Sequence, residues 1–295
     1  MRKLHFSLLL GLSVFATACV DIYKGPESIY NQDLELVLKP SMTGWNKEET
    51  LTAGIEAGLF IDAPGGGLTA ESVYPGSSNL ALKLGEDGLL SASPAVLYPK
   101  DGTKFDFILY SPRMELTGNS IALESPEAAA DLLYSGNLRG KYKSLSPLKP
   151  VFRHVPVKLL LRLSAGFGIT EEEISASTIS LSQTPVSGSF MLADGSFIQS
   201  GEKGSRTFAL KDLQAECLAF PTPADSKETS VLLFEVAGKE FVVRIPDVSV
   251  FEYGNCYEFD VKVSIPGIEI SLVEITDWIA NEEDGTADLI LVTIP

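Results

Sequence analysis

Residues 230–245 read Ser-Val-Leu-Leu-Phe-Glu-Val-Ala-Gly-Lys-Glu-Phe-Val-Val-Arg-Ile. Two runs rich in β-branched and aromatic residues, Ser230–Val236 and Lys239–Ile245, flank the pair Ala237-Gly238. Because glycine readily takes the positive φ that a tight turn demands, this stretch predicts a β-hairpin. The hairpin points to a β-rich fold, and the rest of the chain repeats its pattern.

Short apolar segments separated by turn residues run along the whole chain. The sequence holds 25 glycines and 17 prolines, and such punctuation between short strands is typical of an all-β sandwich or barrel. The other predicted strands are Asp33–Leu38, Ala57–Ile61, Asn79–Leu84, Phe105–Tyr110, Val157–Leu163, Thr178–Ser182, Ser187–Met191, Cys256–Ser264 and Ile268–Ile275. The clearest predicted helix is Ser125–Tyr134, with Ser125 as its cap and Pro126 at its first position.

The length of 295 residues favours two domains, since a domain usually has ~100–200 residues. Prolines and serines interrupt residues 141–150 just before a long apolar strand. We therefore predict a signal peptide at 1–18, an N-terminal β-sandwich domain at 19–149 and a C-terminal β-sandwich domain at 150–295. The alternative is that 141–150 is a loop inside one sandwich and that the division lies further along.

The charge balance excludes one class of partner. The chain carries 23 Lys and Arg against 39 Asp and Glu, a formal net charge of −16. Nucleic-acid binding depends largely on basic side chains that neutralise phosphates, so nucleic acid is not expected as a partner.

The first nineteen residues look like an export signal. Arg2 and Lys3 precede an apolar run, Phe6–Phe15, and small residues lead into Cys19. The run is about half of the ~20 residues needed to span a bilayer, which favours a secretory signal peptide. A cysteine at this place resembles a bacterial lipobox, so Cys19 is the predicted lipidation site and the outer membrane a predicted partner through that lipid. An ordinary cleaved signal with an incidental cysteine is the alternative.

The two remaining cysteines leave their redox state open. In an oxidising exported compartment, a disulfide between Cys217 and Cys256 is possible, and two reduced, buried thiols are the alternative. A cysteine metal site needs more ligands than these two, so no metal is expected.

Residues suited to catalysis are scarce. His154 is the only histidine left after the signal, and at the entry to an apolar strand it is predicted to be structural. The run Gly65–Ala70 imitates a dinucleotide-binding loop, but Pro75-Gly76 would end the helix that such a loop needs, so a flexible surface loop is predicted. The acidic runs Glu171–Glu173 and Glu282–Asp284 are predicted to be solvated turns. We expect neither an enzyme nor a cofactor.

Several short sequence motifs, in order along the chain, carry a resemblance to a known family. They are Ala57-Gly58-Leu59-Phe60-Ile61 after Trp45; Leu97-Tyr98-Pro99 with Phe105–Pro112; Asp131–Ser135 with Phe152-Arg153-His154; and Gly254–Phe259 followed by Ile275-Thr276-Asp277-Trp278. Together they resemble the fimbrillin-like proteins, the lipoprotein pilins and accessory subunits of type V pili. Leu109 departs from the alanine common at its position.

The resemblance implies two β-sandwich domains of transthyretin-like, Greek-key topology. It also implies an exported lipoprotein or surface fimbrium that supports adhesion and has other pilin subunits as partners. Subunits would polymerise by strand exchange, after a protease cuts behind an arginine and removes the first strand of the N-terminal domain. Here that candidate displaced strand carries Leu34, Leu36 and Leu38.

The end of the chain offers a candidate donor strand, Leu289-Ile290-Leu291-Val292-Thr293-Ile294, after an acidic spacer. An uncharged run of this kind aggregates unless it is covered, so we expect it to pair with a sheet. It either enters another subunit or forms the last strand of its own domain.

The N-terminal side lacks the family's cleavage residue. No arginine lies between Cys19 and Arg113. Lys39 precedes a proline, and such a bond is usually a poor substrate for proteases, so Lys24 and Lys47 are left as basic cleavage sites. The chain is therefore predicted either to be matured by a protease of another specificity or to keep its first strand as an anchor or accessory subunit.

A different function remains open, that of a glycan-binding surface lipoprotein built from β-sandwich modules. Exposed rings would stack on sugar faces in such a protein. The candidate rings are Tyr23, Tyr30, Tyr74, Tyr142 and Trp278.

Overall fold

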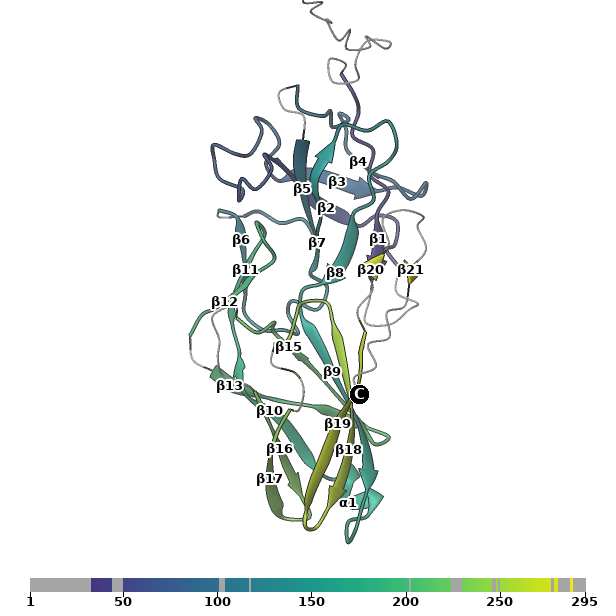
Figure 1. Cartoon of the computed structure of the whole chain (residues 1–295), viewed down its shortest axis with the longest axis vertical. Helices are drawn as coiled ribbons and strands as arrows, with labels where there is room; N and C mark the ends of the chain where they lie inside the picture. The colour runs from purple at the N-terminus through teal and green to yellow at the C-terminus, as the bar shows by residue number, and fades with distance from the viewer. Residues whose placement is uncertain are drawn as a thin grey trace, which may run out of the picture.

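The computed structural model describes residues 33–43, 50–100, 104–116, 118–201, 203–223, 230–245, 248, 250–276, 279–280 and 287–288. Figure 1 shows an elongated molecule with the N-terminal strands at one end and the C-terminal strands at the other. The described chain is almost wholly β-structure, as predicted, with one short helix. No helix in these ranges is long and apolar enough to cross a membrane.

The N-terminal end is built on a seven-stranded sheet in the order β1-β8-β7-β5-β2-β3-β4. Neighbouring strands pair antiparallel except β1 and β8, which run parallel. The strands are β1 Ser41–Thr43, β2 Glu56–Asp62, β3 Leu80–Leu84, β4 Leu90–Ser91, β5 Lys104–Ser111, β7 Leu133–Tyr142 and β8 Val151–His154. All but the first residue of β2 and of β5 are buried, because both faces of this sheet are covered.

One face of this sheet packs against the N-terminal segment and the loop that follows β4. The buried side chains of this first core include Leu59, Ile61, Phe105 and Phe107 from the sheet, with Leu36, Leu38 and Tyr98 laid over them.

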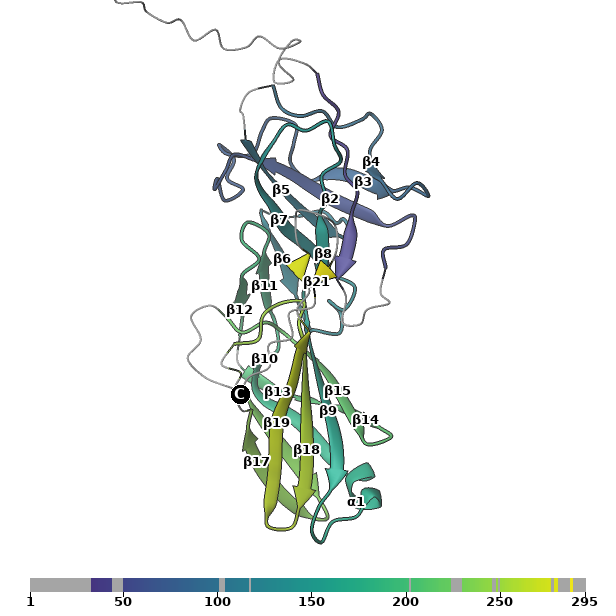
Figure 2. The ribbon, with the colours of Figure 1, turned by 45° about the vertical axis from the view of Figure 1, so that its right-hand side comes forward.

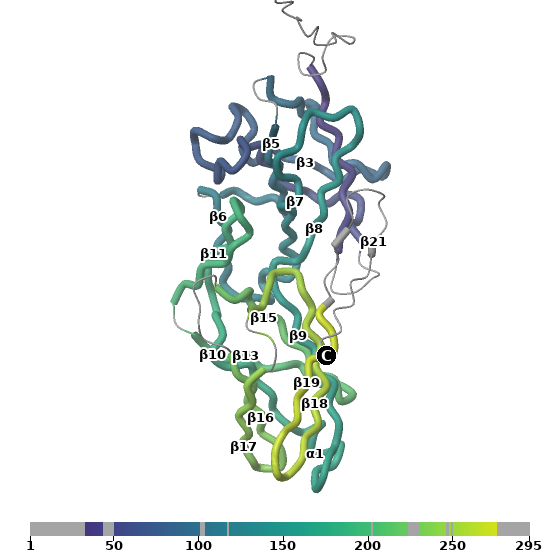
Figure 3. The backbone as a smooth tube through the Cα atoms, in the orientation of Figure 1, coloured from purple at the N-terminus to yellow at the C-terminus, as the bar shows by residue number. Residues whose placement is uncertain are grey.

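The opposite face of the seven-stranded sheet is covered by a three-stranded sheet of mixed origin. Its strands are β6 Ser120–Leu123, β11 Gly188–Met191 and β12 Phe197–Gln199, in the order β12-β11-β6. The hairpin β11–β12 therefore reaches out of the C-terminal half and pairs with β6, where Phe190 lies opposite Ile121. Figure 3 shows β11 running alongside β6.

The C-terminal end is a sandwich of a five-stranded and a four-stranded sheet. The first has the order β14-β15-β9-β18-β19 and the second β13-β10-β16-β17. Their new strands are β9 Val157–Ala165, β10 Thr178–Pro185, β13 Lys203–Thr207, β14 Ala209–Lys211, β15 Gln214–Ala219, β16 Val231–Val236, β17 Lys239–Arg244, β18 Cys256–Ser264 and β19 Gly267–Thr276. Alternate residues of these strands, such as Leu159, Leu161, Phe234 and Phe259, meet in one buried core. A short pair, β20 Ile279–Ala280 and β21 Ala287–Asp288, follows.

The hairpin predicted at 230–245 is confirmed. Strands β16 and β17 pair antiparallel from Val231 opposite Arg244 to Val236 opposite Lys239. The turn between them is Ala237-Gly238, with φ of 51° and 69°. Positive φ at both turn positions is the geometry that matches the twist of a two-residue hairpin.

The helix predicted at Ser125–Tyr134 is wrong. Residues 126–131 form consecutive turns, and Leu133–Tyr142 is strand β7. Ser125 still caps locally, since its Oγ accepts from the backbone N–H of Ala128 at 3.1 Å. The helix does not extend because Leu133 and Tyr134 pair with β5 and β8, and those tertiary contacts outweigh a weak local propensity.

The acidic run Glu171–Glu173 also differs from its predicted turn. It opens the helix α1, Glu171–Ser175. Thr170 caps the helix: its hydroxyl accepts from the N–H of Glu173, and the Glu173 carboxylate accepts from the N–H of Thr170. Carboxylates in a first helical turn are favoured by the helix dipole, which the turn prediction overlooked.

The chain passes from the N-terminal sheet to the C-terminal sandwich close to the expected domain boundary. Strand β8 pairs with β7 and so belongs with the N-terminal sheet, while β9, beginning at Val157, opens the C-terminal sandwich. Hairpin β11–β12 crosses back to the N-terminal end. The division at 149–150 into two domains stays a proposal, and the structure joins the two halves through a shared sheet.

Candidate strand-docking site

The N-terminal segment 33–39 lies over the first core as an extended segment with isolated β-bridges at Glu35 and Leu38 rather than as a full strand. Leu36 and Leu38 are 5% and 1% exposed, and Leu34 is partly buried against the same core. Glu35, between two of them, is exposed. Successive side chains of an extended chain point to opposite faces, so this segment buries every second residue. The three leucines of the candidate displaced strand thus act as one row of apolar side chains.

Backbone hydrogen bonds hold this segment on both of its edges. On one edge, the N–H of Leu36 donates to Val96 O at 2.8 Å and the N–H of Tyr98 donates to Leu34 O at 2.9 Å. On the other edge, Lys39 donates to Leu148 O at 2.8 Å and Leu148 donates to Val37 O at 2.9 Å. The pairing is antiparallel at Leu97 and parallel at Leu148. The segment therefore sits between two neighbours in the way a central strand does.

The parallel edge continues into β1. The N–H of Ser41 donates to Pro150 O at 2.9 Å, and Ser41–Thr43 then pairs in register with Val151–Arg153 of β8. Figure 2 shows β1 lying against β8 at the border of the seven-stranded sheet. Removing the chain up to Thr43 would uncover two unpaired edges and the apolar residues beneath Leu36 and Leu38. Such an opening is a template for an incoming strand.

Other sites predicted from the sequence lie outside the described residues. They are Cys19, the candidate lipidation site; Lys24 and Lys47, the candidate cleavage sites; and the candidate donor strand at 289–294.

The two cysteines are free thiols, and the possible disulfide is wrong. Cys217 on β15 pairs with Leu159 of β9, and Cys256 on β18 pairs with Lys158 of the same strand. Two strand spacings of about 4.8 Å separate them, while a disulfide needs Cα atoms at most about 7 Å apart. They also face opposite sides of the sheet, because their partners are consecutive residues. Burial raises the pKa of Cys217 to about 12 and of Cys256 to about 11.

The histidine considered for catalysis is buried and lies within hydrogen-bond distance of the main chain. His154 is 9% exposed, and its Nδ1 lies 2.8 Å from the carbonyl oxygen of Ala130, in keeping with the structural role predicted for it. Among the residues that the structure describes, no three His, Cys, Asp or Glu side chains gather in a way that could hold a metal ion.

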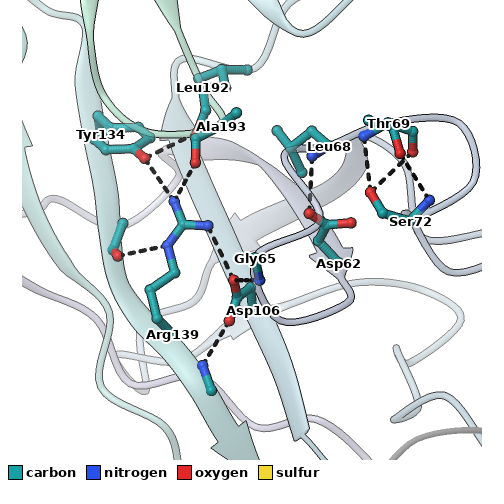
Figure 4. A network of polar contacts seen from close by, with 12 residues as sticks. Asp62, Gly65, Leu68, Thr69, Ser72, Asp106, Tyr134, Arg139, Leu192 and Ala193 are labelled. Atoms are coloured by element: carbon teal, nitrogen blue, oxygen red, sulfur yellow. Dashed lines mark hydrogen bonds and ion pairs between the residues drawn. The ribbon is translucent and has the colours of Figure 1, made fainter.

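The glycine loop is tied down rather than loose. The N–H of Gly65 donates to Asp106 Oδ2 and the N–H of Leu68 to Asp62 Oδ2, each at 2.9 Å. Both carboxylates are buried, and they lie opposite each other on β5 and β2. Figure 4 shows these bonds beside a second group of contacts around Arg139.

Arg139 connects the N-terminal sheet to the hairpin of the C-terminal half. Its Nη1 lies 3.4 Å from Asp106 Oδ2, and its Nη2 donates to Ala193 O at 2.7 Å. Tyr134 donates to Leu192 O at 2.9 Å (Figure 4). The Tyr134 ring also packs edge-on against Phe190, with ring centroids 5.0 Å apart. This polar and aromatic cluster holds the sheet that shapes the strand site against residues from the other half.

The two described aromatic rings that were considered for sugar stacking differ in exposure. Tyr74 is half-buried and packs on Phe105 at 5.3 Å between ring centroids. Tyr142 is 51% exposed, with the Lys104 ammonium 5.0 Å from its ring centre. Tyr23, Tyr30 and Trp278 lie outside the described residues.

The fold and this site define a β-sandwich protein with an N-terminal strand seated over an apolar groove. The chain belongs to the fimbrillin-like family, because the family's sequence model matches residues 47–278. The resemblance noted in the sequence is thereby confirmed.

Named relatives agree with this assignment. A protein of Bacteroides uniformis, provisionally designated fimbrium subunit Fim1C, is 24% identical over 217 residues, which cover 68% of this chain and 71% of the relative. A solved structure of a provisionally described cell adhesion protein from Bacteroides uniformis has a TM-score of 0.61 at 22% identity and covers 82% of this chain and 98% of that one. The truncated tip fimbrial protein Mfa3 of Porphyromonas gingivalis has a TM-score of 0.53 at 12% identity over 84% of this chain and all of that one. The two structures show that the fold is shared.

Proposed function

We propose that this chain is an exported structural or accessory subunit of a type V pilus, joined to other pilin subunits by strand exchange and supporting adhesion at the cell surface. In this proposal the work is structural and needs no catalytic group. Cys19 carries a lipid that attaches the chain to the outer membrane. Family membership supports the fimbrial role, and the geometry of the N-terminal segment supports the mechanism.

The observation that carries the proposal is the seating of residues 34–38. Residues 34–38 bury Leu36 and Leu38 almost completely and are held by backbone hydrogen bonds along both edges and by the packing of the leucine row. Any extended segment with apolar residues at every second position can make the same contacts. A strand of this type is replaceable in principle by another one.

The C-terminal run has the required pattern. In an extended conformation, Ile290, Val292 and Ile294 would share one face, at the spacing of Leu34, Leu36 and Leu38. We propose that this row enters the groove of the next subunit once that subunit has lost its first strand. A subunit that keeps its first strand would instead end the polymer, which is the role of an anchor or accessory subunit.

Deletion of Leu289–Pro295 tests the exchange. We expect surface polymers to disappear from cells while the monomer remains folded, as judged by circular dichroism and a cooperative melt. Polymers of normal length from the deleted chain would contradict strand donation by this segment.

A matched pair of single substitutions sharpens the test. Val292→Asp places a charge on the face proposed to enter the groove, whereas Thr293→Asp places the same charge on the opposite face. We expect the first variant to abolish polymer formation and the second to leave it largely intact, because burial of an unpaired carboxylate is costly. Equal effects would argue against an inserted strand.

A further inference from the structure

Phe167 is an unusually exposed aromatic side chain at the end of the C-terminal sandwich. It is 79% exposed, and Ile265 in the facing β18–β19 turn is 42% exposed. Pro266 in the same turn is exposed as well. We call Phe167, Ile265 and Pro266 the apolar tip. Figure 1 places the β18–β19 turn and the neighbouring α1 at the end of the molecule furthest from β3 and β4.

The apolar tip is held firmly by backbone bonds. The N–H of Ile265 donates to Phe167 O at 2.9 Å, and the N–H of Gly166 donates to Val263 O at 2.8 Å. Gly168 has a φ of 74°, and a Cβ there would lie 2.3 Å from Ile265 Cδ1, so the isoleucine side chain covers this glycine. An exposed phenylalanine on a backbone held in this way is suited to enter a partner's pocket, because the main chain beneath it loses little freedom on binding.

An apolar cleft lies in the N-terminal end, beside the start of β3. It has a volume of about 580 Å³, and its lining includes Tyr74, Pro75, Leu80, Pro94, Val96 and Leu97. Leu97 is 47% exposed at its border. This volume is within the range of about 300–1,000 Å³ seen for pockets that hold a ligand or an anchoring side chain.

The charges beside the two features are opposite. Glu171 and Glu172 on α1 are exposed and follow the apolar tip closely in the chain. Lys83 is exposed two residues after Ala81, which lines the cleft, and Lys100 is itself a lining residue whose side chain is 79% exposed. Lys83 lies opposite Glu56 in the β2–β3 pair, and in the unprocessed chain Lys100 is paired with Asp33 at 3.1 Å, near the exposed Glu35 that bridges to Leu97. Removal of the first strand takes Asp33 and Glu35 away, so a processed subunit offers the Lys100 ammonium beside the cleft to an acidic neighbour.

We propose that the apolar tip of one copy of this chain docks into the cleft of the next copy, with Phe167 as the anchor. Because the two surfaces differ and lie at opposite ends, the contact repeats head to tail and builds an open filament. The contact is small by comparison with the ~1,200–2,000 Å² of stable interfaces, so it needs the tether that strand exchange supplies. It thus rests on the proposed function and adds a second, rigidifying contact between subunits joined by strand exchange.

Photo-crosslinking tests the contact directly. The full chain carrying Phe167→p-benzoylphenylalanine and an equal amount of ¹⁵N-labelled chain are each cut behind Lys47 to remove the first strand, then mixed, allowed to polymerise and irradiated. We expect crosslinks between labelled and unlabelled chains at residues 74–81 or 92–100. Val242→p-benzoylphenylalanine, at an equally exposed position on β17, is the matched control and should not reach the cleft. Crosslinks from position 167 that miss the cleft, or none at all, overturn the proposal.

A second probe asks what fills the cleft. With Leu97→p-benzoylphenylalanine, crosslinks to residues 166–168 or 264–266 of another copy support the proposal. Crosslinks from position 97 that stay within one chain, or that reach other parts of the neighbouring copy, would overturn it.

Polymer stiffness separates this proposal from strand exchange. We expect Phe167→Ser polymers to form but to bend more, with a shorter persistence length in electron micrographs. Unchanged stiffness contradicts the contact and leaves strand exchange standing. If chains that have lost their first strand form no polymers at all, strand exchange fails. Concentrated monomer carrying Phe167→p-benzoylphenylalanine then decides the contact: crosslinks from position 167 to the cleft of another copy support it, and their absence overturns it.

Discussion

The hydroxyl of Tyr134 donates a 2.9 Å hydrogen bond to the carbonyl oxygen of Leu192, 58 residues later in the chain. Tyr134 is the second residue of β7 in the N-terminal sheet, and Leu192 follows β11 in the hairpin that the C-terminal half contributes. The face of the sheet opposite the strand site is therefore covered by residues of the other half. We expect the two halves to unfold together, because neither buries this core alone.

Loss of the Tyr134 hydroxyl should be costly. In Tyr134→Phe the buried carbonyl of Leu192 loses its side-chain donor, and Arg139 loses one of its acceptors. We expect the free energy of unfolding to fall by about 1–3 kcal/mol, measured by urea denaturation. Tyr142→Phe, at a ring that is 51% exposed, should change it by less than about 0.5 kcal/mol. Two separate unfolding transitions in the wild type would contradict the coupling of the halves.

The leucine row should contribute strongly to the stability of the unprocessed chain. Leu38 is 1% exposed, and Leu38→Ala should lower the free energy of unfolding by about 2–5 kcal/mol, since it leaves a cavity in the core. Leu145→Ala, at a side chain that is 73% exposed, is the control and should be nearly neutral. If Leu38→Ala were equally neutral in chemical denaturation, the segment would not be seated as described.

The thiols of Cys217 and Cys256 should be unreactive in the folded protein. Burial raises the pKa of Cys217 to about 12 and of Cys256 to about 11, above the ordinary value of 9.0, so neither should react with Ellman's reagent at pH 8 until denaturant is added. Reduction should leave the intact mass unchanged. A mass increase of two hydrogen atoms on reduction would show a disulfide instead.

The same raised pKa values predict a pH dependence of stability. As the pH rises above about 9, the unfolded chain loses its thiol protons while the folded chain keeps them, so the unfolded state gains stability. The contribution of the buried thiols is thus complete below pH 9 and is lost progressively up to pH 11–12. The double variant Cys217→Ala/Cys256→Ala should show a shallower fall of melting temperature over pH 8–10 than the wild type. Parallel curves for the two proteins would rule out this assignment.

The N-terminus should reveal whether the chain is an anchor. If Cys19 is lipidated and the first strand is kept, the intact mass of the membrane-extracted protein should correspond to a chain that begins at Cys19 and carries lipid. Cys19→Ser should then move the protein from the outer-membrane fraction into the soluble one. A mature chain that begins at Glu48, after Lys47, would exclude the unprocessed anchor and indicate processing by a lysine-directed protease.

Much of the fold was predictable because its signals are local. The hairpin at 231–244 follows from the glycine at its turn, and the row of Leu34, Leu36 and Leu38 follows from a period of two. The alternating burial of these leucines was therefore predictable, while their role as a displaced strand stays a proposal. The helix prediction at Ser125–Tyr134 failed because it rested on a good cap and a run of alanines, which are local signals. In the folded chain the end of this segment pairs with strand β5, and that pairing takes the backbone groups that a helix would need.

The sequence by itself determined the β-class, the family and the alternating leucines, because each depends on turn residues or on the spacing of residues a few positions apart. Only the tertiary structure decided that β11 pairs with β6, that Cys217 and Cys256 face opposite sides of one sheet, and that Arg139 reaches Ala193. These relationships join segments tens of residues apart. Their register depends on how whole sheets pack, and no single stretch of sequence carries that information.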